Sequence, residues 1–121
     1  MKAPVRITSA VARQPIREVE RQRDDVESWW LGDIEREAMS RRHVQSLAGI
    51  VAAKKAIIRL AGEPPCDTGP ADIRIGHDER GAPVVEALPA NLASRLPGKL
   101  HVSITHTREF AWGLAVLERP A

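Results

Sequence analysis

The hydrophobic residues at the start of the chain first alternate with polar ones and then recur at helical spacing. Val5 and Ile7 alternate with polar residues, which predicts a short first strand. Pro15 suits the first turn of a helix, because its missing N–H is not needed there. An apolar stripe then extends the predicted helix. The stripe contains Ile16, Val19 and Val26 and ends near Trp29 and Trp30, for which a place in the core is favoured over one at a protein interface.

Two further helices are predicted before the middle of the chain. Gly32-Asp33 breaks the first helix, and Asp33 can cap a short helix that runs through Met39. The strongest helical pattern runs from about His43 to Leu60 and is closed by Gly62 and the Pro64-Pro65 pair. This helix is apolar on nearly all sides, so it is expected to be buried.

The second half of the chain changes to a period of two. Ile73 and Ile75 precede a turn at 78–81, and Val84-Val85 follows it, which predicts a hairpin. A short helix over 90–96 and two strands complete the chain. The strands cover 100–105, with Leu100, Val102 and Ile104 on one face, and 111–117. The resulting fold class is α+β, a mostly antiparallel sheet packed on one long central helix.

Length and composition limit the class of protein. The 121 residues suit a single domain over 1–121, and 43% hydrophobic with 28% charged residues argue against wholesale disorder. Cys66 is the single cysteine, which fits a reducing compartment. The N-terminus lacks the apolar stretch of a signal peptide, and no segment has the ~20 apolar residues of a membrane span. A cytoplasmic location without membrane contact is expected.

The charges argue against nucleic acid as a partner. The net charge is only +2, and the arginines of the first third are interleaved with acidic residues. Interleaved charge is typical of solvated helix faces, whereas nucleic-acid binders carry an unbalanced basic patch or aromatic stacking groups.

Two basic residues stand out on the central helix. On a helical wheel Lys55 falls within the apolar arc, and Arg59 lies one turn further on, at its edge. Like charges at this spacing repel unless an anion lies between them. The interpretations are a Lys55 that reaches solvent with Arg59 at the surface, an internal partner such as Glu35 or Glu37, or a bound phosphate. The arc contains Val44, Leu47, Ala48, Val51 and Ile58.

The C-terminal strand carries a second group of polar side chains. His101, Ser103 and Thr105 share one face, and His106 follows on the opposite parity at the strand end. Hydroxyl and imidazole groups bind phosphate oxygens, although a polar strand face is more often structural. Ser103 and His106 point to opposite faces, which argues against a nucleophilic triad. The single Cys and the scattered His residues show no zinc-ligand spacing.

Three motifs in register resemble the holo-acyl-carrier-protein synthases, which are 4′-phosphopantetheinyl transferases. Residues 47–56, Leu-Ala-Gly-Ile-Val-Ala-Ala-Lys-Lys-Ala, are similar to the family helix Leu-Ala-Gly-Arg-Phe-Ala-Ala-Lys-Glu-Ala. Residues 72–83 resemble its Asp-Ile-Glu-Val…Asp-x-x-Gly-x-Pro hairpin. Residues 101–107 resemble its His-Val-Ser-Ile-Ser/Thr-His-Thr segment. The matches extend over about three-quarters of the chain.

The resemblance implies an activity, a cofactor and an assembly. Such enzymes move the phosphopantetheine arm of coenzyme A onto a serine of an acyl carrier protein, using Mg²⁺. They are homotrimers with active sites at subunit interfaces. The family binds its metal through an N-terminal Asp and the Glu of Lys-Glu-Ala, and it contacts phosphate through a later Lys and the His-Thr pair.

This chain departs from the family at the metal ligands. The family Glu is Lys55, and the N-terminal Asp is expected near Thr8 or Ser9. Asp33, Glu35 or Glu37 could supply another ligand. The phosphate-contacting Lys is Arg59, which keeps the charge. Lys54, His106 and Thr107 match the family, as does Pro83, and all four are predicted to contact coenzyme A.

These departures predict a site that lacks the carboxylate ligands for Mg²⁺. Lys55 and Arg59 would hold the diphosphate directly, and His106 and Thr107 would orient the phosphate under attack. Because a fixed charge rarely replaces a divalent ion in a transition state, a weak enzyme or none is expected. The alternatives are an inactive pseudoenzyme that binds coenzyme A or the carrier protein, and a structural subunit of an active paralogue. The predicted carrier-docking face contains Arg17, Arg21, Arg36 and Arg41.

Overall fold

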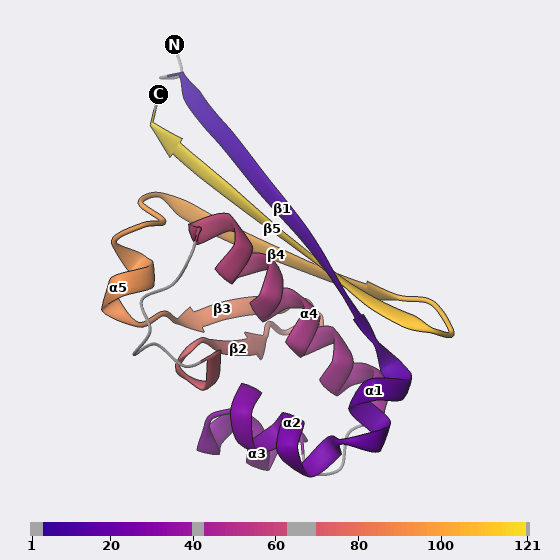
Figure 1. Ribbon diagram of the computed structural model, residues 1–121. Coiled ribbons are helices and arrows are strands. Elements are labelled where there is room, and N and C mark those ends of the chain that lie inside the picture. Colours follow the sequence, from indigo (N-terminus) through magenta and orange to yellow (C-terminus); the bar gives the residue numbers. More distant parts are fainter. Residues whose placement is uncertain (1–3, 40–42, 63–69, 121) are drawn as a thin grey trace.

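The computed structural model describes residues 4–39, 43–62 and 70–120 (Figure 1). Its α+β architecture and antiparallel strand pairing confirm the predicted fold class. Pro64-Pro65, Cys66 and Arg41 lie outside the described residues. The strands are β1 (Val5–Pro15), β2 (Arg74–His77), β3 (Pro83–Ala87), β4 (Lys99–His106) and β5 (Phe110–Pro120). The helices are α1 (Ile16–Arg21), α2 (Arg23–Trp30), α3 (Asp33–Met39), α4 (Val44–Ala61) and α5 (Ala90–Ala93), with a 3₁₀ turn, η1 (Pro70–Asp72).

The main sheet has the strand order β1-β5-β4. β1 and β5 pair antiparallel over their whole length, from Val5 opposite Pro120 to Pro15 opposite Phe110. β2 and β3 form the predicted hairpin, and β3 packs beside β4. β1 and the hairpin therefore lie at opposite sides of this layer, with β5 and β4 between them.

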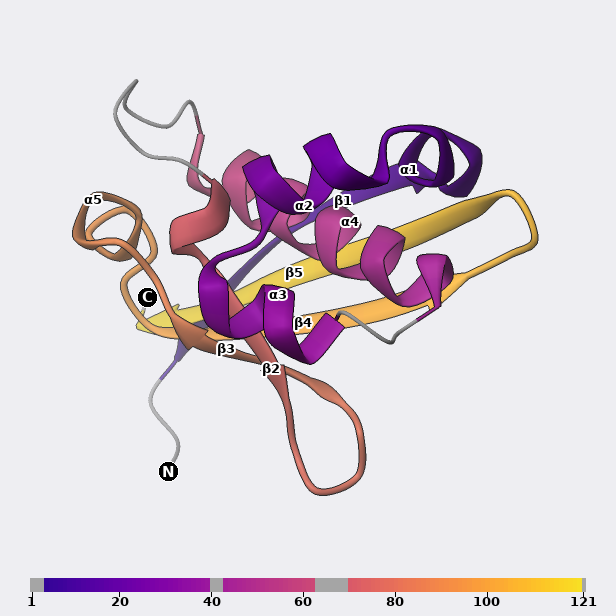
Figure 2. The ribbon, with the colours of Figure 1, turned by 90° about the horizontal axis from the view of Figure 1, so that it is seen from below.

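Helix α4 crosses the inner face of the main sheet at very short range. A Cβ atom on Gly113 of β5 would lie 2.4 Å from the backbone carbon of Ala52, and one on Gly49 would lie 2.6 Å from Cγ2 of Ile104. Glycine at both positions lets helix and sheet approach this closely. Figure 2 shows α4 between the main sheet and the N-terminal helices. The surrounding core is built largely from small and aliphatic side chains of α4 and the sheet.

The N-terminal region differs from the prediction in three respects. β1 is longer than expected, because it pairs with β5 as far as Pro15. The single predicted helix is two helices, since Gln22 with φ −122° and ψ 33° interrupts it. The expected burial of Trp29 is wrong: its side chain is 63% exposed, while Trp30 is half-buried against the core. The break at Gln22 ends the stripe begun by Ile16 and Val19.

Among the described residues, no helix is long and apolar enough to cross a membrane.

Candidate functional site

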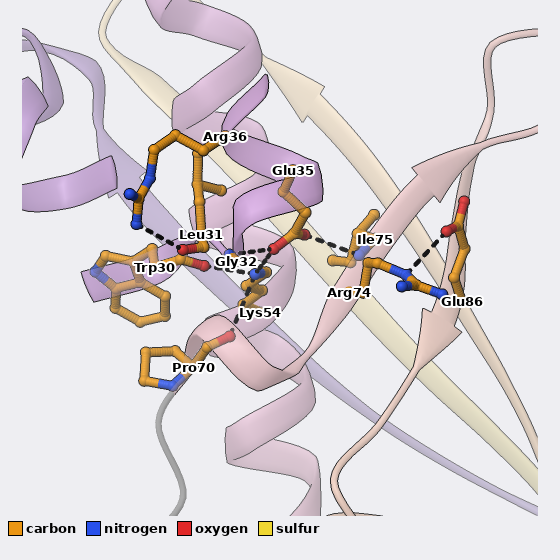
Figure 3. A network of polar contacts seen from close by, with 10 residues as sticks. All are labelled: Trp30, Leu31, Gly32, Glu35, Arg36, Lys54, Pro70, Arg74, Ile75 and Glu86. Carbon is orange, nitrogen blue, oxygen red and sulfur yellow. Dashed lines mark hydrogen bonds and ion pairs between the residues drawn. The ribbon is translucent and has the colours of Figure 1, made fainter. Parts of the chain in front are cut away.

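The two adjacent lysines of α4 lie in different environments. Lys54 is 0% exposed, and its ammonium donates to Oε1 of Glu35 at 2.6 Å and to the carbonyl oxygens of Trp30 and Pro70 (Figure 3). A lysine ammonium has three hydrogens, so these three acceptors use all of them. Lys54 has no hydrogen left for a ligand, which argues against the predicted contact between its ammonium and coenzyme A.

Glu35 connects α3 to two other elements around this lysine. Its Oε1 also accepts from the backbone N–H of Gly32 at 3.1 Å, and its Oε2 accepts from that of Ile75 at 2.9 Å. Burial lowers the pKa of Lys54, while the hydrogen bond and charge of Glu35 oppose this shift. Of the two internal partners considered for Lys55, Glu35 is excluded, because its carboxylate binds the preceding lysine.

Lys55 points toward β1. Its ammonium donates to Oε1 of Gln14 and lies 5.6 Å from the centre of the Trp30 ring. Burial lowers the pKa of Lys55, the charge of Glu18 opposes that shift, and the like charge of Arg59 adds to it. Lys55 is therefore a half-buried cation with a neutral hydrogen-bond acceptor and a second cation nearby.

Arg59 lies one turn further along α4 and is exposed, as one of the sequence interpretations expected. Its Nη1 donates to the backbone carbonyl of Val11, so the guanidinium rests against β1. Gln14, Lys55 and Arg59 together form what we call the β1-edge cluster. Arg59 is the solvent-exposed end of this cluster and Gln14, 4% exposed, is its buried end.

Gln14 was not a predicted site residue. Gln14 and Ala12 are buried on the same face of β1, whereas Val11 and Arg13 between and beside them are exposed. An extension of the alternating strand pattern to Gln14 is the signal that could have placed it. Thr8 and Ser9, where a metal ligand was expected, lie six and five residues before it. At the rise of an extended strand that separation is about 17 to 20 Å. The β1 side chain that meets Lys55 is therefore Gln14 rather than Thr8 or Ser9.

The polar residues of the C-terminal strands lie on β4, which β5 separates from β1. His106 is exposed at the end of β4, and the register places it in the same row as Ala111 and Gln14. Two strand spacings separate His106 from Gln14, which is about 10 Å between their Cα atoms. Within the described residues, no hydrogen bond links His106 to the β1-edge cluster. Pro83 lies on the hairpin beside β4, further still from β1.

Thr107 closes the tight turn between β4 and β5. Its backbone N–H donates to the carbonyl of Phe110 at 2.8 Å, and its Oγ1 accepts from the Phe110 N–H at 3.2 Å. The carbonyl of Glu109 in the same turn accepts from the N–H of Ile16 at 2.9 Å. The β4–β5 turn is thus hydrogen-bonded to the first residue of α1.

Comparison with known proteins finds relatives of one kind. The holo-[acyl-carrier-protein] synthase of Halalkalibacterium halodurans is 35% identical over 80 residues, which cover 65% of this chain and 61% of that protein. This chain is thus similar in sequence to holo-[acyl-carrier-protein] synthases over about two thirds of its length. The match spans about three-fifths of the length of this curated relative. No family model matches the chain.

Solved synthase structures share the whole fold. The apo synthase of Chronobacterium ammoniagenes superimposes with a TM-score of 0.81 over 98% of this chain and all of its own, at 22% identity. The Bacillus anthracis synthase in complex with coenzyme A (3′,5′-ADP) has a TM-score of 0.78 and 24% identity. It covers 92% of this chain and 95% of its own. These neighbours show that the holo-ACP synthase fold extends over nearly the whole described chain.

The cluster does not fit the Mg²⁺ that the resemblance implies. Mg²⁺ prefers carboxylate and phosphate oxygens in octahedral geometry, whereas the β1-edge cluster offers one amide oxygen and two cations. The Lys55 ammonium already occupies that amide oxygen and repels a divalent ion. Glu35, considered as a substitute ligand, is committed to Lys54. The described residues contain no group of three or more His, Cys, Asp or Glu side chains suited to a metal.

Proposed function

We propose that this protein transfers the 4′-phosphopantetheine arm of coenzyme A to a serine of an acyl carrier protein. The observation that carries the proposal is the Lys55–Arg59 pair, two cations one helical turn apart on α4 of a holo-ACP synthase fold. Coenzyme A contains a diphosphate, an anion that would relieve the repulsion between these two cations. The Bacillus anthracis relative, solved in complex with coenzyme A, supports the same ligand.

The reaction is a displacement at phosphorus. The serine oxygen of the carrier bonds to the phosphorus that bears pantetheine, and the bond from that phosphorus to the 3′,5′-ADP oxygen breaks. The serine proton passes to solvent, and 3′,5′-ADP leaves with the electron pair. In this proposal Lys55 and Arg59 neutralise charge on the diphosphate, and His106 and Thr107 orient the phosphate under attack.

A homotrimer would complete the site. In one chain, His106 lies on β4 and Pro83 on the hairpin beside it, whereas Lys55 and Arg59 contact β1. A second copy beside β1 would add its own β4–β5 turn to the cluster. The outer face of the main sheet offers an apolar surface for such contact. It exposes Val5 at 59%, Ile7 at 60%, Val11 at 47% and Leu114 at 37%.

The carrier protein would dock on basic residues near α1. Arg17 and Arg21 of α1 and Arg36 of α3 are exposed, and Arg41 lies outside the described residues. An acidic carrier surface is complementary to this face. Reversal of Arg17 and Arg21 to Glu is expected to abolish carrier binding and leave coenzyme A binding intact.

The direct test is the mass of the carrier protein. Apo acyl carrier protein is incubated with the protein, coenzyme A and Mg²⁺, with a parallel sample in chelator. A mass increase of one phosphopantetheine arm supports the proposal. No increase with several carriers, despite measurable coenzyme A binding, contradicts transfer.

That negative outcome would establish the second candidate function, a binding module without turnover. The observation that favours it is Lys55 hydrogen-bonded to Gln14, because the resemblance implies a metal-binding Glu at position 55.

A further inference from the structure

The charges around Lys55 leave the β1-edge cluster with an excess of positive charge. Lys55 and Arg59 are like charges at i,i+4, and the acidic residue that acts on Lys55 is the exposed Glu18 of α1. Burial and Arg59 outweigh Glu18, since the pKa of Lys55 is lowered rather than raised. A bound anion would remove this repulsion.

Gln14 orients Lys55 without neutralising it. Nε2 of Gln14 donates to the carbonyl of Pro15 at 3.2 Å, which directs Oε1 toward the ammonium. The amide is 4% exposed, so it is fixed by its surroundings. A carboxylate at this place would form an ion pair with Lys55 and compete with an external anion. The neutral amide holds the ammonium and leaves its charge available.

The other contacts of the two cations also leave donors for a ligand. The Trp30 ring takes one side of the Lys55 ammonium, and Gln14 takes one of its three hydrogens. Arg59 is exposed, and its bond to Val11 uses one of the five N–H groups of a guanidinium. Both cations can therefore donate to phosphate oxygens while keeping these contacts.

We propose that Gln14, Lys55 and Arg59 bind the diphosphate of coenzyme A directly, without a divalent cation. Lys55 and Arg59 are the ligand contacts, and Gln14 is the positioning residue that holds Lys55 as an uncompensated charge. This inference rests on the proposed function, because it takes coenzyme A as the ligand, but it concerns how the diphosphate is bound rather than whether transfer occurs.

The test is calorimetric titration of the protein with coenzyme A, in chelator and in Mg²⁺. Equal affinity in the two buffers is expected. Gln14→Glu, nearly identical in shape, is expected to weaken binding at least about tenfold, since one charge-assisted contact is worth roughly that factor. Lys55→Met and Arg59→Gln should each weaken it similarly. Lys99→Met, an exposed charge removed from β4, is the matched control and should have no effect.

Thermal unfolding of each variant shows whether weaker binding comes from misfolding or from a lost contact. Arg59→Gln is the substitution that should disturb the core least, because Arg59 is exposed. Binding that requires Mg²⁺ would overturn this inference alone. Tight binding by both Gln14→Glu and Arg59→Gln would also overturn it. No coenzyme A binding in either buffer would overturn both the inference and the proposed function.

Discussion

The Lys54 ammonium lies 2.6 Å from Oε1 of Glu35, and the two side chains are 0% and 4% exposed. The same carboxylate accepts from the backbone of Gly32 and Ile75, so one buried ion pair joins α3, α4 and β2. Breaking a buried pair by removing one partner is costly, because the other charge stays in a poorly solvating environment.

Glu35→Ala is therefore expected to lower the free energy of unfolding by about 3 to 5 kcal/mol. The measurement is equilibrium urea unfolding followed by circular dichroism. Glu79→Ala, at the exposed tip of the hairpin, is the control and should change stability by less than about 0.5 kcal/mol. A loss below about 1 kcal/mol in Glu35→Ala would show that the ion pair does not hold these elements together.

The double variant Glu35→Leu with Lys54→Met is expected to be more stable than Glu35→Ala. Replacing both charges with apolar side chains leaves no unpaired ion. Such a replacement of a buried ion pair often leaves the stability of the fold unchanged or increases it. Two backbone N–H groups, of Gly32 and Ile75, still lose their acceptor, so recovery should be partial. A double variant no more stable than the single one would contradict the unpaired-charge explanation.

Gly113→Ala is expected to destabilise the protein by about 1 to 3 kcal/mol, the usual cost of overpacking. The new Cβ would lie 2.4 Å from the backbone of Ala52, which cannot move without shifting α4. Gly49→Ala is the comparison. It meets only the Ile104 side chain, and alanine favours a helix over glycine by ~1 kcal/mol. Thermal melts should therefore rank Gly49→Ala as the more stable variant.

Lys55→Glu with Gln14→Glu is expected to convert the site to metal dependence. Two carboxylates would face each other where a cation and an amide now do, and carboxylates are the ligands that Mg²⁺ prefers. Coenzyme A affinity should fall in chelator and recover with Mg²⁺, and Mn²⁺ binding should become detectable by paramagnetic resonance. Mn²⁺ binding of equal strength to the unmodified protein would contradict this.

Coenzyme A affinity is expected to fall as pH rises. Burial and Arg59 lower the pKa of Lys55 in the free protein, whereas a bound diphosphate favours the ammonium and raises that pKa. Binding therefore takes up a proton between the two pKa values. Affinity should be constant below the pKa of the free protein, which lies under the ordinary lysine value of 10.5, and decline above it.

The measurement is titration between about pH 8 and about pH 10, where phosphates are fully ionised. A coenzyme A thioether avoids titration of the thiol. Lys55→Arg, which keeps its charge at these pH values, should show a flat profile. A decline of the same size in Lys55→Arg would assign the titration to another group.

The central helix was predictable because its signals are local. The apolar pattern and Gly62 placed it at about 43–60, and α4 runs from Val44 to Ala61. The buried lysine was not predictable from that pattern. A helix that is apolar on nearly all sides has no single inward arc, so the wheel could not distinguish Lys54 from Lys55. The acceptors that bury Lys54 come from Trp30 and Pro70, 24 and 16 residues away.

Only the part of the candidate site that lies within the sequence motifs was predictable. Lys55, Arg59, His106 and Thr107 became candidates because they lie in or next to short motifs that can be matched in the sequence alone. Gln14 was missed because the first strand was expected to be short, and only its pairing with β5 extends it to Pro15. Contacts between distant segments thus decided which β1 side chain meets Lys55.

The hydrogen bond from the Ile16 N–H to the Glu109 carbonyl joins the start of the proposed carrier-docking helix to the turn that holds Thr107. In the proposed trimer, that turn would complete the cluster of a neighbouring copy. The helix that receives the carrier at one site and the turn that serves the next site would then belong to one unit, held together by this hydrogen bond and by the pairing of β1 with β5. Docking of a carrier at one site would thus bear on the alignment of phosphate at another.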